Sequence, residues 1–81
     1  MKHSVEISPR ARKDLRKIDA ETSDRILLRI AALNDDLAGD VKRLTDFEPE
    51  YRLRVGNYRI LFDLEDNKVV VRRVKHRREA Y

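Results

Sequence analysis

The chain has 81 residues, the size of one small domain, and it lacks cysteine, which excludes a disulfide framework and cysteine-ligated zinc. No apolar run approaches the roughly 18 residues of a membrane-spanning helix, and the N-terminus lacks the apolar core of a signal peptide, so we expect a soluble cytoplasmic protein. Lysine and arginine outnumber aspartate and glutamate by 19 to 15, and residues 51–81, with 9 basic and 4 acidic side chains, hold the whole excess, which predicts an anionic partner such as nucleic acid.

Residues 3–18 predict a short strand followed by a helix. Val5 and Ile7 alternate with polar neighbours, as they do in a strand with one buried face. The pair Ser8-Pro9 is typical of a helix start, because a serine hydroxyl caps free N–H groups and proline fits the first helical position. Apolar residues at positions 11, 15 and 18 form one stripe, so we expect a helix over residues 9–18.

A second helix is expected after Asp19, which can cap its N-terminus, and Gly39 is its expected stop. The predicted buried face of this helix consists of Ile26, Leu27, Ile30, Ala31, Leu33 and Leu37. Residues 40–50 are predicted to be a connector, because Pro49 prevents this stretch from being a central strand.

Residues 51–74 predict three consecutive strands, because apolar residues recur at every second position. Gly56-Asn57 is a two-residue turn signal, since both residue types readily adopt positive φ. Pairing across this turn places apolar residues opposite one another on the inner side, which makes the register self-consistent. The same register places Arg54 opposite Arg59 on the outer side, where like charges destabilise a sheet by a few tenths to about 1 kcal/mol.

A second hairpin that closes with Leu64 opposite Val69 would bring Arg72 beside Leu61 on the same outer face. Several guanidiniums would then share one open surface, with Asp63 as the nearest carboxylate. Arginine binds phosphate through two N–H groups and keeps its charge, so the pattern predicts a phosphate-binding face. The alternative is a strand face that is merely solvated.

Together these elements predict an α+β fold of order β-α-α-β-β-β, in which an antiparallel sheet carries a helical hairpin on one face and leaves a basic face open. No phosphate-binding glycine loop is expected, since Gly39 and Gly56 stand alone. The two histidines are far apart in the sequence and the acidic residues lack the spacing of a ligand loop, so no metal or other cofactor is expected.

Three parts of the chain resemble the RelE/ParE toxin superfamily. Residues 51–62, with the sequence YRLRVGNYRILF, resemble its "YRxRxGxYRxxY" core. Residues 74–81, with the sequence VKHRREAY, resemble the "HR…Y" terminus of RelE-like members, and a strand followed by a Ser-Pro-x-Ala-x-x-Asp-Leu helix also fits. The resemblance covers essentially the whole chain and implies a single RelE-like toxin domain over residues 1–81.

The resemblance implies a ribosome-dependent endonuclease that cleaves mRNA in the A site by attack of the ribose 2′-hydroxyl on the adjacent phosphate. It also implies that a cognate antitoxin holds the toxin inactive. By position, Arg52 and Arg54 match residues that bind the RNA backbone, and Arg59 matches the arginine that stabilises the extra charge on phosphorus. Arg77 matches a basic residue near the leaving group, and Tyr81 matches a terminal tyrosine that orients the nucleotide.

The proton transfers of this reaction have no evident carrier in the sequence. Some relatives carry lysines where this chain has Arg52 and Arg54, and an arginine cannot act as a base. His76 is the only histidine in the basic region, and its ordinary pKa near 6.5 suits an acid or a base. Glu48 and Glu50 are more typical of solvated connector residues. Tyr51 and Tyr58, which begin the first two of the three predicted strands, point inward by alternation.

Three other functions compete with the nuclease. A ParE-like toxin has the same fold and inhibits DNA gyrase without cleaving RNA, but gyrase inhibition needs neither a basic strand face nor a tyrosine-terminated tail. A non-catalytic nucleic-acid-binding module would share the basic face, but Tyr81 would then be dispensable. The third is a toxin that has lost its activity.

Overall fold

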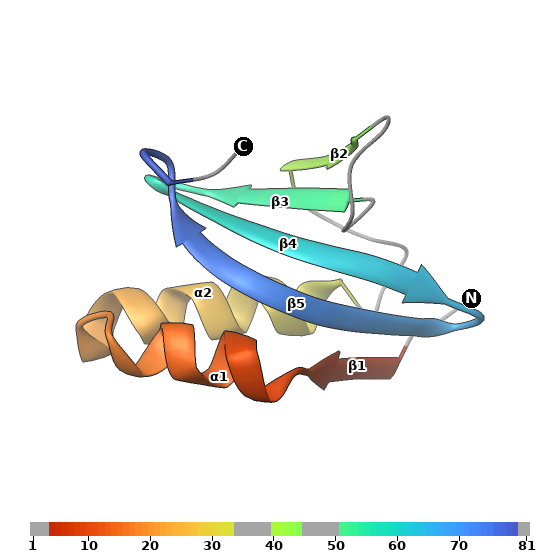
Figure 1. Ribbon diagram of the computed structural model, residues 1–81, viewed down its shortest axis with the longest axis horizontal. Coiled ribbons are helices and arrows are strands. Elements are labelled where there is room, and N and C mark those ends of the chain that lie inside the picture. The colour runs from red at the N-terminus through yellow and green to blue at the C-terminus, as the bar shows by residue number, and fades with distance from the viewer. Residues whose placement is uncertain (1–3, 34–39, 45–50, 80–81) are drawn as a thin grey trace.

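The computed structural model describes residues 4–33, 40–44 and 51–79. Within these ranges two helices lie on one face of a five-stranded sheet (Figure 1), which confirms the predicted α+β class. None of the described helices is long and apolar enough to cross a membrane. The elements in chain order are β1 (Ser4–Ile7), α1 (Pro9–Arg16), α2 (Ala20–Ala32), β2 (Asp40–Arg43), β3 (Tyr51–Val55), β4 (Tyr58–Glu65) and β5 (Lys68–His76).

The sheet has the strand order β1-β5-β4-β3-β2 and differs from the prediction in two ways. First, β1 runs parallel to β5, so the sheet is mixed. No tight turn joins these two strands, and only a tight turn forces an antiparallel pair. Second, β2 lies within the predicted connector and pairs with the outer edge of β3. Its inward residue Val41 packs against the core, but one apolar residue in four gives too little alternation to be recognised.

Both helices start at their predicted caps. The Ser8 hydroxyl accepts a hydrogen bond from the backbone N–H of Ala11 at 3.1 Å, and the Asp19 carboxylate accepts one from Thr22 at 3.0 Å. Helix α1 ends at Arg16, two residues before the predicted end. There the hydrogen bonds tighten to residues three positions back, which turns the chain toward the next cap at Asp19.

Helix α2 ends at Ala32, and the predicted residues Leu37 and Gly39 lie outside the described part of the chain. The predicted burial of Leu27 and Ala31 is wrong, because Leu27 is 37% exposed and Ala31 is also exposed. Ile26, Ile30 and Leu33 form the buried stripe. Each exposed residue directly follows a buried one, so it points about 100° farther around the helix axis.

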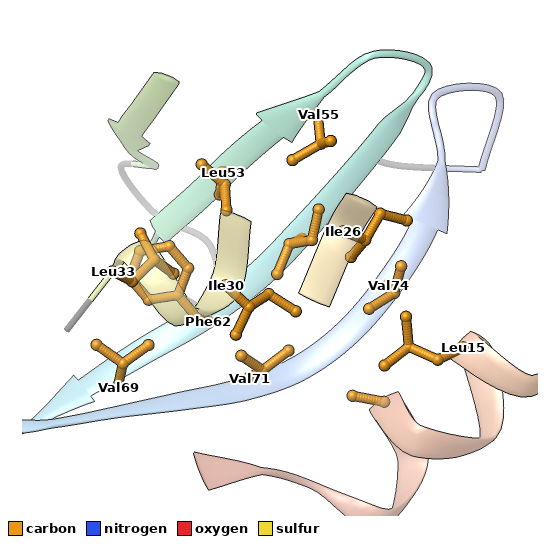
Figure 2. Packing of buried hydrophobic residues seen from close by; sticks show 12 residues of the cluster. Leu15, Ile26, Ile30, Leu33, Leu53, Val55, Phe62, Val69, Val71 and Val74 are labelled. Carbon is orange, nitrogen blue, oxygen red and sulfur yellow. The ribbon is translucent and has the colours of Figure 1, made fainter. Parts of the chain in front are cut away.

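The core lies between the helices and the inner face of the sheet (Figure 2). Full burial of a leucine, isoleucine or phenylalanine stabilises the fold by roughly 1.5–3 kcal/mol. The rings of Tyr51 and Phe62 stack with centroids 5.4 Å apart, and Tyr51 and Tyr58 pack against the core as predicted. The buried cluster consists of Ala11, Leu15, Ile26, Ile30, Leu33, Leu53, Val55, Ile60, Phe62, Val69, Val71 and Val74.

The register of both hairpins follows the turns. Arg54 faces Arg59 across β3 and β4 as predicted, and Gly56 has the expected positive φ of 56°. Leu64 faces Val69, which confirms the start of the second hairpin. The predicted pairing of Arg72 with Leu61 is wrong, because a β-bulge interrupts the ladder.

The bulge makes Arg72 an extra residue in β5. Phe62 pairs with Val71, whereas Leu61 pairs with Arg73. The alternation of side chains therefore reverses after the bulge. Val74 is buried, Lys75 lies on the outer face and His76 lies on the helix face. Strict alternation from Val71 would place each of these three residues on the opposite face.

Candidate nucleic-acid interface

Three basic residues form a line across the outer face of the sheet, which is the face opposite the helices. Arg59 on β4 is the Cα partner of Arg54 on β3 and of Lys75 on β5. Arg54 is exposed, and the other two are half-buried. We call Arg54, Arg59 and Lys75 the cationic row. Neighbouring like charges of this kind cost up to about 1 kcal/mol per pair, so the row does not serve the stability of the sheet.

The guanidinium of Arg59 is held at the β3–β4 turn. Its Nη1 donates hydrogen bonds to the carbonyl oxygens of Gly56 and Tyr58, each at 3.0 Å. Among the described residues, no acceptor binds its Nε or Nη2. The side chain is thus fixed in place while N–H groups are left to donate to a ligand. A phosphate oxygen suits this arrangement, because charge-assisted hydrogen bonds to guanidinium are short and strong.

Arg77 lies at the same end of the sheet as Arg59. Its backbone N–H donates to the carbonyl oxygen of Asn57 at 2.7 Å, which fastens the start of the tail to the β3–β4 turn. In Figure 1 this turn and the end of β5 lie side by side. The side chain of Arg77 is exposed. Tyr81, the other residue of the tail with an expected role, lies outside the described residues.

Arg52 lies one cross-strand row away from Arg54 on the same strand. It is the Cα partner of Lys42 on β2 and Leu61 on β4, and it is half-buried. Arg54 itself pairs on its other side with Asp40 of β2. The predicted residues Arg52, Arg54 and Arg59 are therefore brought together on the outer face, and the backbone of Arg77 lies at the same end of the sheet as Arg59.

Arg72 does not join this group. Its Nε donates to Asp63 at 3.0 Å and its Nη2 to Glu65 at 3.3 Å. These carboxylates lie on the far half of β4 and balance its charge. The bulge gives the side chain this position, since Arg72 no longer pairs with Leu61.

His76 lies on the helix face, opposite to the cationic row. It pairs with Tyr58, and the two rings meet edge to face with centroids 5.4 Å apart. Its Nδ1 accepts a hydrogen bond from the backbone N–H of Arg78 at 3.3 Å. With Asp14 and Glu79 it lines a shallow pocket of about 190 Å³. Within the described ranges, no group of three histidine or acidic side chains could hold a metal ion.

An ion pair between Asp14 of α1 and Arg73 anchors the bulge. Arg73 donates through Nε at 2.8 Å and through Nη2 at 3.3 Å, and the backbone N–H of Val74 donates to the same carboxylate at 2.9 Å. Burial favours a higher pKa for Asp14, but the hydrogen bonds from Arg73 and Val74 and the charge of Arg73 outweigh it and lower the pKa. The hydrogen bond to Asp14 raises the pKa of Arg73 in turn.

Sequence reasoning missed both Lys75 and this anchor. Lys75 reaches the outer face only because of the bulge, and the bulge depends on a contact between residues 60 positions apart. Asp14 stands in the Ser-Pro-x-Ala-x-x-Asp-Leu pattern of the first helix, which was the available signal.

The sequence and this fold were compared with known proteins. The family model described as "ParE toxin of type II toxin-antitoxin system, parDE" matches residues 5–81. The chain belongs to the RelE/ParE superfamily of type II toxins. A curated relative, Toxin RelE3 of Methanocaldococcus jannaschii, is 35% identical over 74 residues, which are 85% of this chain and 84% of the relative.

Solved structures of RelE-type toxins share the fold. The toxin–antitoxin complex RelBE2 from Mycobacterium tuberculosis contains a chain that is similar with a TM-score of 0.81 and 26% identity, covering 94% of this chain and 99% of that one. The RelB-RelE complex from Methanococcus jannaschii gives a TM-score of 0.76 and 30% identity over 90% of this chain and 91% of that one. The superfamily thus includes members named ParE and members named RelE, and the cationic row of this toxin bears on which activity it has.

Proposed function

We propose that this toxin is a metal-independent endoribonuclease that needs no cofactor and cleaves mRNA in the A site of the ribosome. The observation that carries the proposal is the gathering of Arg54, Arg59 and the start of the Arg77 tail at one end of the outer sheet face. Transition states of phosphoryl transfer gain most from fixed positive charge near the phosphorus. The two hydrogen bonds that hold Arg59 in place supply such a fixed charge.

In the proposed reaction the ribose 2′-oxygen forms a bond to the adjacent phosphorus, and the bond from phosphorus to the 5′-oxygen breaks. The products are a 2′,3′-cyclic phosphate and a 5′-hydroxyl, so one proton leaves the 2′-hydroxyl and one is added to the 5′-oxygen. Arg59 stabilises the pentavalent phosphorane, and Arg77 stabilises the leaving oxygen. Arg52 and Arg54 bind the backbone, and Tyr81 stacks on the nucleotide.

The proposal gives His76 no part in proton transfer. Its ring faces Tyr58 on the helix side, whereas the phosphate would lie on the outer face with Arg59. A proton carrier has to come within hydrogen-bond reach of the reacting oxygen. The ribosome can supply the orientation of the mRNA and much of the preorganisation of the reaction.

A cognate antitoxin is the proposed partner of the free toxin. The similar toxins of M. tuberculosis and M. jannaschii were solved as complexes with their antitoxins. A segment that folds on binding can cover a large surface, and an acidic one would match the cationic row. Because its target is the translating ribosome, we place the toxin in the cytoplasm.

Primer extension on ribosomes programmed with a defined mRNA tests the proposal. We expect the wild-type protein to produce cleavage at the A-site codon and Arg59→Ala to produce almost none. The ribosome-free mRNA should stay intact under the same conditions.

Gyrase inhibition is the competing function, and the ParE description of the matching family model favours it. A parallel assay of DNA supercoiling distinguishes the two. Trapped gyrase–DNA complexes together with intact mRNA would contradict the nuclease and support the ParE-like function.

A further inference from the structure

Lys75 occupies a place on the outer face that none of the expected roles covers. It is the Cα partner of Arg59, and it completes a line of three cations over β3, β4 and β5. Neighbouring strands lie about 4.8 Å apart, so the row spans about 10 Å across the sheet. A row of this length is longer than one phosphate group and suits a polyanion that crosses the strands.

The bulge is what turns Lys75 outward. Strict alternation from Val69, which is buried, would point Lys75 toward the helices and Val74 to the outside. The extra residue at Arg72 reverses this order, so that Val74 is buried and Lys75 faces Arg59. Asp14 fixes the reversed order through its hydrogen bonds to Arg73 and Val74.

Lys75 forms no ion pair among the described residues that would stabilise the sheet. Among the described residues, no carboxylate lies within salt-bridge distance of its ammonium group. The outer-face acids Asp63 and Glu65 are bound to Arg72. Lys68 at the other end of β5 differs in this respect, because it forms an ion pair with Glu6 at 3.5 Å. Because Lys75 lies beside Arg59 and has no carboxylate partner of this kind in the described part of the chain, it adds electrostatic repulsion to the free protein.

We propose that Lys75 is a further RNA-binding residue of this site, which binds the phosphodiester backbone next to the phosphate held by Arg59. The inference rests on the proposed nuclease function and deepens it. Lysine offers a compact, mobile charge rather than a rigid fork. We therefore expect Lys75 to bind the RNA about equally in the bound substrate and in the transition state. Such a contact lowers KM but hardly raises kcat. Asp14 acts as a positioning residue, because it holds the bulge that brings Lys75 to this face.

The test compares four proteins on programmed ribosomes: the wild type, Lys75→Gln, Lys75→Arg and the matched control Lys68→Gln. The control removes the same charge from the same strand. We expect Lys75→Gln to raise KM about tenfold, the loss of one charge-assisted contact, and to change kcat less than about threefold. Lys75→Arg and Lys68→Gln should stay within about twofold of the wild-type KM, since neither removes the phosphate contact.

Binding of a single-stranded RNA oligonucleotide at several salt concentrations gives a second readout that a purely structural role would not move. The slope of log affinity against log salt should fall by about 0.7 in Lys75→Gln and stay unchanged in Lys75→Arg. Thermal unfolding of all four proteins checks that they are folded alike.

The outcomes separate the inference from the function on which it rests. If the wild type cleaves and Lys75→Gln matches Lys68→Gln in KM and salt slope, the role of Lys75 is refuted and the nuclease function stands. If the wild type cleaves no mRNA on ribosomes, the proposed function itself fails, and the role of Lys75 in it fails as well.

Discussion

At one end of the outer face Arg59 lies between two other basic residues, whereas toward the other end Arg72 lies between two carboxylates. The residue type, the face and the sheet are the same, yet the electrostatic settings are opposite. The Arg72 arrangement contributes a surface ion pair, whose typical worth is up to about 1 kcal/mol. The Arg59 arrangement costs stability. A basic strand residue is thus a candidate for function where its cross-strand neighbours are also basic.

The largest expected effect comes from removing the positive charge of Arg59. In Arg59→Gln we expect single-turnover cleavage to fall on the order of 10²-fold or more, as it does when a transition-state donor is removed. The free energy of unfolding should change by less than about 1 kcal/mol, because relief of repulsion offsets the loss of one exposed and one partly buried hydrogen bond. Single-turnover cleavage and thermal unfolding measured side by side check both statements.

Arg72→Gln is the matched control for this change, since it removes the same guanidinium from the same face. Its cleavage rate should stay within about threefold of wild type, and its stability should fall by up to about 1 kcal/mol. Equal losses of cleavage in the two variants would show that general positive charge, and not the cationic row, supports the activity.

The Asp14 anchor gives the next largest effect. Asp14→Asn should lower the free energy of unfolding by about 2 kcal/mol, since a largely buried carboxylate loses its charge opposite Arg73. Although burial opposes them, the hydrogen bonds from Arg73 and Val74 hold the pKa of Asp14 below its ordinary value in the folded protein. Its contribution to stability is therefore complete at pH values above the unfolded pKa and is lost as the pH falls through the folded pKa.

Chemical denaturation at a series of pH values below about 5 measures this dependence. The stabilisation by Asp14 begins to be lost near the ordinary aspartate pKa of about 3.9 and is lost further as the pH falls. The wild type should lose more stability than Asp14→Asn as the solution becomes more acidic. Parallel curves for the two proteins would show that the ion pair does not stabilise the fold.

The smallest expected effect is that of His76. Loss of a general acid or base usually costs 10²- to 10⁴-fold in rate, but we expect His76→Gln to cleave within about threefold of wild type. The reason is its place against Tyr58 on the helix face. A loss of cleavage of about 10²-fold or more in a variant that unfolds at the wild-type temperature would restore His76 to the reaction.

How far the sequence predicts these two regions depends on the range of the contacts that build them. The Gly56-Asn57 turn fixes the β3–β4 register locally, so the pairing of Arg54 with Arg59 was predictable from the turn alone. The caps at Ser8 and Asp19 are equally local. The α+β class follows from the periods of the apolar residues and needs no contact between distant segments.

Other features depend on contacts between distant segments. The bulge in β5 is held by Asp14, which lies 59 positions before Arg73. Without this contact, strict alternation along β5 would place His76 on the outer face and Lys75 toward the helices. The parallel direction of β1 is likewise set by pairing with a strand more than 60 positions away, as in the pair of Ser4 and Lys68.

The bulge also separates the number of residues in β5 from the faces on which they lie. Deletion of Arg72 would join Val71, opposite Phe62, directly to Arg73, opposite Leu61, so strict alternation would then leave Val74 buried and Lys75 beside Arg59. Loss of the bulge without a deletion would instead rotate every following side chain of the strand to the opposite face, so that Lys75 would enter the core and His76 would lie beside the arginines. A family member with one residue fewer at this point therefore keeps the same outer face on a regular strand, and an in-frame gap here leaves the chemistry of the surface unchanged.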